Sequence, residues 1–216
     1  MSDAKRNILE KIHHALQVPS DKPPVPAGGI SDVFKSKQED LVDQFRREFE
    51  AIQGRFTHCV SKHELLQQLT ALVRQKKAEK KVVCYSRILR DHYAGPELDL
   101  ITQAAPGNDY DAYIGITDCE CLLARTGTIL MSSSQPAGRI FPVYVPIHVV
   151  VATERQLVYD IDDMFNAKEE LIGDAAPSAL YFISGPSRTG DIEKTLVLGV
   201  HGPLELFVFL IKDNLE

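Results

Sequence analysis

The sequence has no apolar run long enough to cross a membrane, and this absence narrows the classes of protein to consider. Its longest apolar runs, residues 143–152 and 204–211, are far shorter than the roughly 20 residues that span a bilayer. The first 17 residues, MSDAKRNILEKIHHALQ, mix acids with bases and have no apolar segment of the kind found in signal peptides. We therefore expect a cytoplasmic protein with no membrane partner.

The sequence also lacks a basic excess and the common nucleotide-binding motifs. Its 24 Lys and Arg residues are outnumbered by 30 Asp and Glu residues, which gives a net charge of -6. A nucleic-acid surface needs positive charge to neutralise phosphates, so a nucleic-acid partner is not expected. Neither G-x-G-x-x-G nor a Walker motif is present. We therefore predict no nucleotide site and no cofactor.

Cysteine is scarce, and its four positions do not form a standard metal motif. Cys59 and Cys84 lie in apolar, strand-like surroundings, which is typical of buried free thiols. Cys119 and Cys121 form C-x-C, whereas zinc and iron–sulfur sites generally need four ligands. A structural role is favoured and a metal or redox role remains the alternative. We predict no metal site.

The chain begins with an amphipathic helix and a proline-rich linker. Within residues 1–18, four apolar residues fall on one stripe: Ile8, Leu9, Ile12 and Leu16. Residues 19–37 contain four prolines and two adjacent glycines, which favour an extended linker. A helix of four turns is marginal alone in water, so it must dock on its own subunit, a symmetry mate or a partner. Residues 38–216 are long enough for one domain.

Strand-like and helix-like segments alternate within residues 38–216. This alternation predicts an α/β fold, a three-layer α/β/α sandwich with a largely parallel sheet. We expect a helical or turn segment at residues 119–125 and a helix at residues 154–168. Strands are expected at residues 196–200 and 205–211. Only four residues separate them, too few for a parallel crossover, so an antiparallel edge is expected there.

Residues 183–203 read ISGPSRTGDIEKTLVLGVHGP and carry the strongest functional signal. Two glycine-containing loops follow strand-like runs, and loops at strand ends are where α/β proteins build sites. Arg188, in the first loop, is suited to binding a carboxylate or phosphate. His201, in the second loop, is suited to proton transfer near neutral pH. The segment predicts a site for a small anion.

These motifs resemble those of the LUD-domain family, in particular its lactate-utilisation protein C branch. The resemblance rests on four motifs: GPSRTGDIE (residues 185–193), GVHGP (residues 199–203), the upstream TGT turn (residues 126–128) and Pro-x-His (residues 146–148). It covers roughly residues 40–213. One departure is Arg125, because family members usually carry an acid before TGT.

The resemblance implies a fold similar to the sugar-phosphate isomerase and CoA-transferase group. It also implies a part in carbon metabolism, the bacterial oxidation of L-lactate to pyruvate, alongside iron–sulfur partner proteins. The alternative is an isomerase or transferase acting on a sugar phosphate or CoA ester. Whether the chain is itself an enzyme, and whether it forms a homo-oligomer, stays open.

The candidate site residues fall into two groups. The candidates for ligand binding are Thr126, Gly127, Thr128, Arg139, Gly185, Ser187, Arg188 and Thr189. The candidates for catalysis are Asp191, Glu193 and His201.

Each candidate also has a structural interpretation. Arg188 could pair with Asp191 or Glu193, and these acids could cap a helix. His201 could be a core histidine, which is also the favoured interpretation of His148. The TGT segment could be only a tight turn, and Arg139 could lie in a solvated loop.

Overall fold

The computed structural model describes residues 3–17, 40–76, 81–92, 102–103, 111–168, 171, 176–189, 197–198 and 202–212. The chain divides into two compact units, Met1–Lys37 and Gln38–Glu216. In the first unit, helix α1 (Asp3–Gln17) exposes the apolar side chains of Ile8, Leu9 and Ile12. The linker predicted at residues 19–37 lies outside the described residues. No helix in the described part of the chain is long and apolar enough to span a membrane.

The second unit is built on a six-stranded sheet in which every neighbouring pair is parallel. Its strands, in spatial order, are β1 (Arg55–Cys59), β12 (Glu205–Ile211), β7 (Ile147–Thr153), β4 (Ile114–Thr117), β2 (Val82–Cys84) and β3 (Thr102–Gln103). The predicted α/β class with a largely parallel sheet is confirmed. The expected antiparallel edge is wrong, because β12 lies inside the sheet, parallel to both neighbours. Almost all of β12 is apolar and buried, as is typical of strands covered on both faces.

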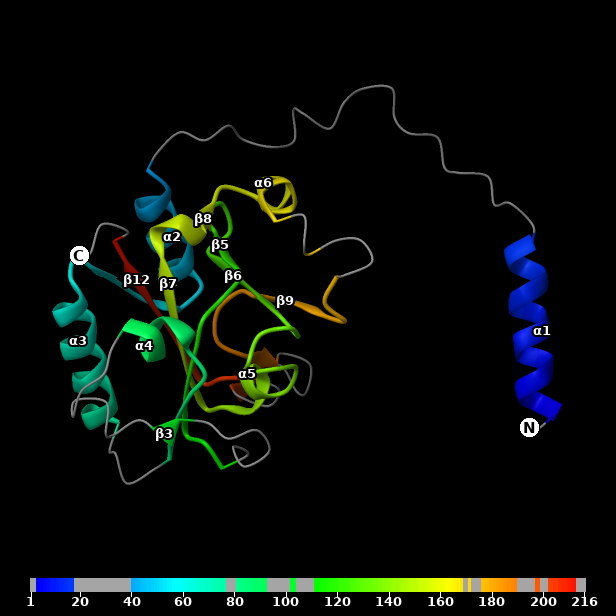
Figure 1. The fold of residues 1–216 in the computed structure, drawn as a ribbon, viewed down its shortest axis with the longest axis horizontal. Helices are drawn as coiled ribbons and strands as arrows, with labels where there is room; N and C mark the ends of the chain where they lie inside the picture. The colour runs from blue at the N-terminus through cyan, green and yellow to red at the C-terminus, as the bar shows by residue number, and fades with distance from the viewer. Residues whose placement is uncertain are drawn as a thin grey trace. The chain divides into compact units, whose positions relative to one another are not determined.

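One face of this sheet is covered by helices α3 (Lys62–Gln75) and α4 (Arg87–His92) (Figure 1). The side chain of Ser61 accepts a hydrogen bond from the Glu64 amide, which starts α3 as its sequence predicts. Leu65, Leu69 and Leu89 of these helices pack on the sheet. They form one of the two main cores of the unit.

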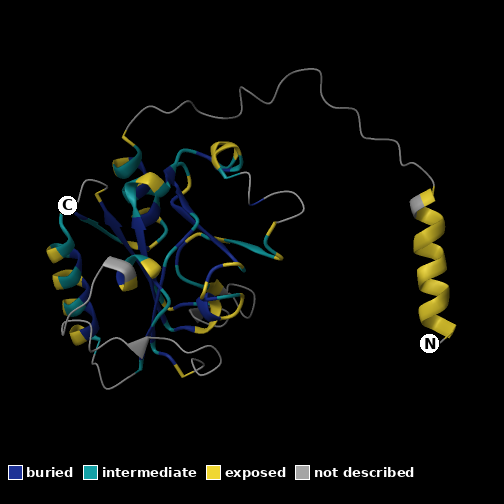
Figure 2. Ribbon diagram, in the orientation of Figure 1, coloured by how far each residue is buried: buried dark blue, intermediate teal, exposed yellow. Residues whose placement is uncertain are grey.

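The other face is covered by helix α2 (Leu41–Ala51) and a second, smaller sheet. That sheet has the order β8 (Leu157–Val158), β5 (Cys121–Leu123), β6 (Thr128–Ser132) and β9 (Leu180–Ile183). Short helix α5 (Phe141–Tyr144) covers a further part of this face, while α6 (Ile161–Ala167) packs on the outer side of the small sheet. This covering layer therefore contains strands as well as helices, and buried segments line its inner side (Figure 2).

Two local expectations are wrong. The segment predicted as helix or turn at residues 119–125 contains strand β5. The helix predicted at residues 154–168 is divided into a 3₁₀ turn (Glu154–Gln156), β8 and α6. Asp160 breaks this segment because its side chain accepts a hydrogen bond from the Ile161 amide and starts a new helix there.

The strand predicted at residues 196–200 does not join the main sheet. Its described part, β11 (Val197–Leu198), pairs antiparallel with β10 (Arg188–Thr189). The GPSRT motif is therefore part loop and part strand.

Candidate functional site

The last turn of α2 is the platform on which two predicted site loops rest. Gly127 has a φ of +60°, and a Cβ there would lie 2.4 Å from the backbone nitrogen of Phe49. Gly185 has a φ of +86°, and a Cβ there would lie 2.5 Å from the carbonyl oxygen of Ile52. Both positions need glycine for the backbone angle and for the close approach. The TGT and GPSRT segments are thus held against one helix end.

The GPSRT and GVHGP segments meet each other. The Ser187 amide donates a hydrogen bond to the Pro203 carbonyl, with a nitrogen–oxygen distance of 2.9 Å. A Cβ on Gly202 would lie 2.9 Å from the Ser187 Cβ. Pro203 is two residues before β12, so this contact lies at the amino-terminal edge of the parallel sheet.

The TGT turn joins the same group through hydroxyl contacts. Thr126 Oγ1 donates to Thr128 Oγ1 at 2.8 Å, and Thr128 Oγ1 lies 2.8 Å from Ser184 Oγ. Thr128 is buried, whereas Thr126 and Ser184 are exposed. The structure therefore brings the described parts of all three motifs together, with a row of hydroxyl groups between two of them.

Arg188 has a partner that the sequence did not indicate. Its Nη2 atom donates a hydrogen bond to the Ile52 carbonyl at 2.7 Å, although the side chain is exposed. The bond ties the GPSRT segment to the end of α2. A guanidinium has five N–H donors in a rigid fork, so one bond orients the group without using its full capacity.

Arg139 lies at the other end of the small sheet from the TGT turn. The β6–β9 register places Ile129 opposite Ile183 and Ser132 opposite Leu180. Arg139 donates to the carbonyl of Ser178, which precedes β9, at 2.9 Å. Five strand residues rise by about 13 Å between their ends. The structure does not bring Arg139 together with the other candidates.

The three predicted catalytic residues, Asp191, Glu193 and His201, lie outside the described residues. Thr189 is described as part of β10, without its side chain. The proposed roles of Asp191, Glu193 and His201 remain predictions.

Sequence reasoning missed a polar group at the carboxyl-terminal edge of the parallel sheet. Chain connections leave β2 and β4 in opposite directions, so a topological switch point lies between them, and such points often bind ligands in α/β proteins. There Asp118 accepts hydrogen bonds from the Ser86 hydroxyl and from the Arg87 amide at 2.8 Å. Burial raises the pKa of Asp118. These contacts cap α4. The sequence signal that could have indicated this group is Asp118 itself, a polar residue directly after a buried strand.

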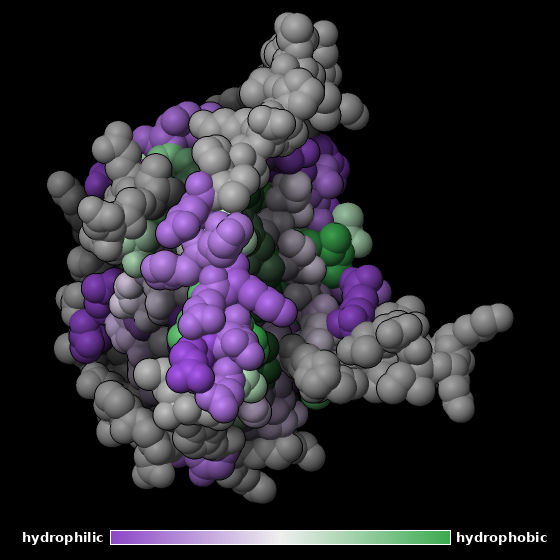
Figure 3. Space-filling view, turned by 90° about the vertical axis from the view of Figure 1, so that its right-hand side faces the viewer, coloured by the Kyte–Doolittle hydropathy of each residue, from purple (hydrophilic) through white to green (hydrophobic). Residues whose placement is uncertain are grey.

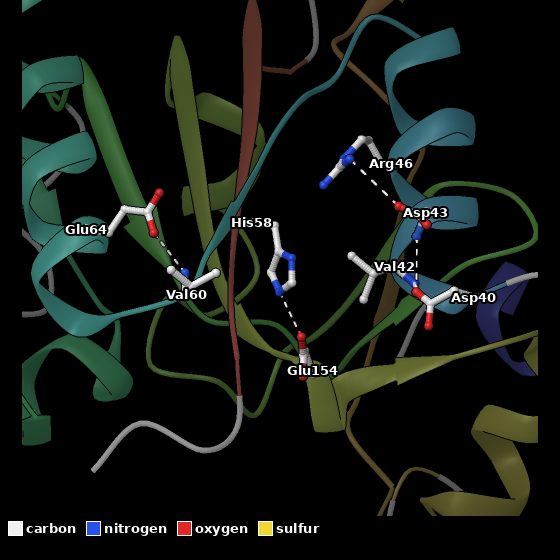
Figure 4. A network of polar contacts seen from close by, with 8 residues as sticks. All are labelled: Asp40, Val42, Asp43, Arg46, His58, Val60, Glu64 and Glu154. Carbon is white, nitrogen blue, oxygen red and sulfur yellow. Dashed lines mark hydrogen bonds and ion pairs between the residues drawn. The ribbon is translucent and has the colours of Figure 1, made fainter.

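A second polar pair lies at the same edge. His58 Nε2 is 2.7 Å from Glu154 Oε1, which links the end of β1 to the residue after β7. Figure 4 shows the two side chains pointing toward one another, while Glu64 turns away toward the Val60 amide. The start of α2 lies nearby, capped by Asp40. This edge is held by pairs within the protein.

Comparison with known proteins relates part of this chain to a described family and supports the fold. A family model described as LUD domain matches residues 107–211. These residues match the LUD domain over just under half of the chain. They include all three predicted motifs but not α2, on which the motifs rest.

This chain is also similar to several named proteins. Lactate utilization protein C of Shouchella clausii (strain KSM-K16) is 35% identical over 104 residues, 48% of this chain and 45% of that protein. Lactate utilization protein C of Geobacillus sp. (strain WCH70) is 31% identical over 137 residues, 60% of this chain and 57% of that protein. The chain thus spans about half the length of these curated relatives.

A solved structure shares the fold. The crystal structure of a DUF162 family protein from Deinococcus radiodurans has a TM-score of 0.60 and 21% sequence identity to this chain. The match covers 79% of this chain and 96% of the solved one.

Arg125, which stands before TGT, has an acidic partner. Its Nε atom lies 2.5 Å from Oδ2 of Asp160, the buried residue that caps α6. The cation therefore ties the start of the TGT turn to the start of α6.

His148 is buried in β7, and Nε2 of its ring lies 2.8 Å from Thr117 Oγ1. Burial lowers the pKa of His148 from 6.5 to about 4. Its Nδ1 atom is buried without a hydrogen-bond partner among the described residues. These observations agree with a structural histidine.

All four cysteines are free. Burial is the main cause that raises the pKa of Cys59 and Cys121 to about 12, that of Cys84 to about 11, and that of Cys119 well above its usual range. No group of three or more His, Cys, Asp or Glu side chains that could hold a metal ion occurs in the described part of the chain.

The close contact at Gly127 gives a first prediction. Gly127→Ala should destabilise the protein by about 2–5 kcal/mol, because it combines a strained positive φ with overlap against the α2 backbone. Gly138 is the matched control, with a φ of +62° and no atom within 4 Å of a Cβ. Gly138→Ala should cost only about 1–2 kcal/mol. Equal losses in urea denaturation would contradict the platform role of α2.

The buried His148 gives a second prediction, for acid pH. The pKa of His148 is lower in the folded chain than in the unfolded chain. Between these two values, His148 is protonated in the unfolded chain and neutral in the folded one. Stability should therefore fall as pH drops from about 6.5 toward 4, by about 3 kcal/mol in total. Urea denaturation of the wild type and His148→Leu across this range isolates the effect, because other groups titrate in both proteins. Parallel pH profiles would count against a neutral, buried His148.

The cysteines give a third prediction. In the folded protein at pH 8, Ellman's reagent should react slowly with all four thiols, because only about one in a thousand molecules of a thiol with a pKa near 11 is ionised. The same protein in guanidinium chloride should release four equivalents at once. Fast labelling of Cys119 or Cys121 in the folded protein would instead favour the redox alternative.

Proposed function

We propose that this protein takes part in bacterial L-lactate utilisation and binds a small anionic ligand at its motif loops. The observation that carries the proposal is that the TGT and GPSRT segments rest on one helix end and that the described part of GVHGP contacts GPSRT. These segments lie within the residues that match the LUD domain. The names of the relatives, lactate utilization protein C in several bacteria, support lactate utilisation as the pathway.

The loops offer the chemistry that a small carboxylate needs. Arg188 is exposed and oriented by its bond to Ile52, so its other N–H groups suit a carboxylate, which accepts parallel hydrogen bonds. The hydroxyl of exposed Ser184 supplies a further donor when Thr128 donates to it, whereas the single hydrogen of the Thr126 hydroxyl goes to Thr128. His201 would move a proton, and Asp191 or Glu193 would organise the site.

Partner proteins complete the proposed role. Oxidation of L-lactate to pyruvate releases two electrons, and we propose that iron–sulfur proteins accept them while this chain works beside them. Growth tests this part of the proposal. A bacterium deleted for this gene should fail to grow on L-lactate alone, grow normally on glucose, and recover when the gene returns. Normal growth of the deletion strain on L-lactate would refute the role.

The ligand site gives a fourth prediction, tested by calorimetric titration with L-lactate, pyruvate and inorganic phosphate. Arg188→Ala should weaken binding of the carboxylate ligand about ten- to hundredfold, because a charge-assisted hydrogen bond contributes roughly 1.5–3 kcal/mol. The melting temperature should change little, since the side chain is exposed.

Arg139→Ala is the matched control. Arg139 is also exposed and also donates one hydrogen bond to a backbone carbonyl, but at the far end of the small sheet. Its removal should leave binding unchanged. If both variants bind as the wild type does, Arg188 only ties the loop to α2.

A further inference from the structure

Helix α2 ends in a turn that commonly contains glycine. Its C-cap residue is Ile52, and the amide of the next residue, Gln53, donates to the Glu50 carbonyl at 2.9 Å. The Gly54 amide donates to the Phe49 carbonyl, also at 2.9 Å. These two bonds form a Schellman motif, in which the residue directly after the cap takes the left-handed conformation. Gln53 occupies this position with a φ of +68°, where glycine is the usual residue.

Gln53 combines a strained backbone with an exposed side chain. Among the described residues, it is the only one other than glycine that has a positive φ. Its side chain is exposed and makes no hydrogen bond or ion pair within the described part of the chain. Exposed polar side chains are common in this protein, and the face seen in Figure 3 is largely hydrophilic. The backbone is what distinguishes Gln53, because strained residues of this kind cluster at functional sites.

Gln53 lies beside the guanidinium of Arg188. The Ile52 carbonyl oxygen accepts the hydrogen bond from Arg188 Nη2 at 2.7 Å. A Cβ on Gly185 would lie 2.5 Å from the same oxygen. Because Gln53 follows Ile52 directly, its Cα lies within roughly 6 Å of Arg188 Nη2. The side chain of a glutamine is long enough to reach a ligand bound at this guanidinium.

A glutamine amide offers a function that Arg188 lacks. The guanidinium only donates hydrogen bonds, and it suits the two oxygens of a carboxylate. In L-lactate, the carbon beside the carboxylate carries a hydroxyl group, which both donates and accepts. The Gln53 amide has two N–H donors and one acceptor oxygen, so it matches both functions of that hydroxyl.

We propose that Gln53 is a further ligand-binding residue, whose side-chain amide binds the hydroxyl group beside the carboxylate held by Arg188. The ligand class is then a 2-hydroxycarboxylate and not any small acid, because a site built to bind a hydroxyl group rejects an analogue without one. This inference rests on the ligand site proposed at Arg188.

Two substitutions separate the side chain of Gln53 from its backbone and give a fifth prediction. Gln53→Met keeps the strained φ but removes the amide. It should weaken L-lactate binding about tenfold in calorimetric titration and leave the midpoint of urea denaturation unchanged. Gln53→Gly removes the amide and the strain, so it should weaken binding equally and raise the urea midpoint. The matched control is Gln67→Met, at an exposed position of α3 on the other face of the main sheet, which should bind as the wild type does.

Titration with propionate completes the test, because propionate is lactate without its hydroxyl group. The wild type should bind L-lactate about tenfold more tightly than propionate, and both Gln53 variants should lose this preference. Wild-type affinity in Gln53→Met, or an unchanged preference for L-lactate in both variants, would overturn the role of Gln53 and leave the Arg188 site standing. A wild type that binds neither acid would refute the proposed ligand site, and the role of Gln53 with it.

Discussion

The candidate site depends on the close approach of two glycines to the last turn of α2. Gly127 and Gly185 both place backbone where a Cβ would overlap the helix backbone. The positions of the TGT and GPSRT segments are therefore set by α2 and not by their own turn preferences. The GVHGP segment follows, because Pro203 and Gly202 contact Ser187. A change in α2 would move all three motifs together.

The polar groups of this fold are divided between two edges of the sheet. The motif loops lie at the amino-terminal edge, whereas Asp118 and the His58–Glu154 pair lie at the carboxyl-terminal edge. Strand β7 has seven residues and spans about 20 Å. A ligand as small as lactate cannot reach both edges. The carboxyl-terminal groups therefore hold strand ends and helix starts, as the capping of α4 by Asp118 illustrates.

The sequence predicted the α/β fold because strand and helix periodicities are local properties. The predictions from the sequence were wrong where contacts between distant residues determine the structure. Strand β5 is short and entirely buried, so its pattern does not distinguish strand from helix. The short connection before strand β12 suggested an antiparallel hairpin, but β12 pairs in parallel with β1 and β7. The family motifs indicated the site loops, but the contact between Gly127 and Phe49 joins residues 78 positions apart. No local sequence pattern predicts such a contact.

The direction of α2 also bears on the proposed ligand. Its Asp40-capped start lies at the carboxyl-terminal edge, so its last carbonyl groups point toward the motif loops. A helix end of this kind carries about half a negative charge, which disfavours a nearby anion by about 0.3–1 kcal/mol for each unit of charge. Arg188 offsets this effect where it binds the Ile52 carbonyl. A monocarboxylate meets half the repulsion that a doubly charged phosphate would meet. For the proposed site, the geometry of α2 therefore favours a small carboxylate over a phosphorylated ligand.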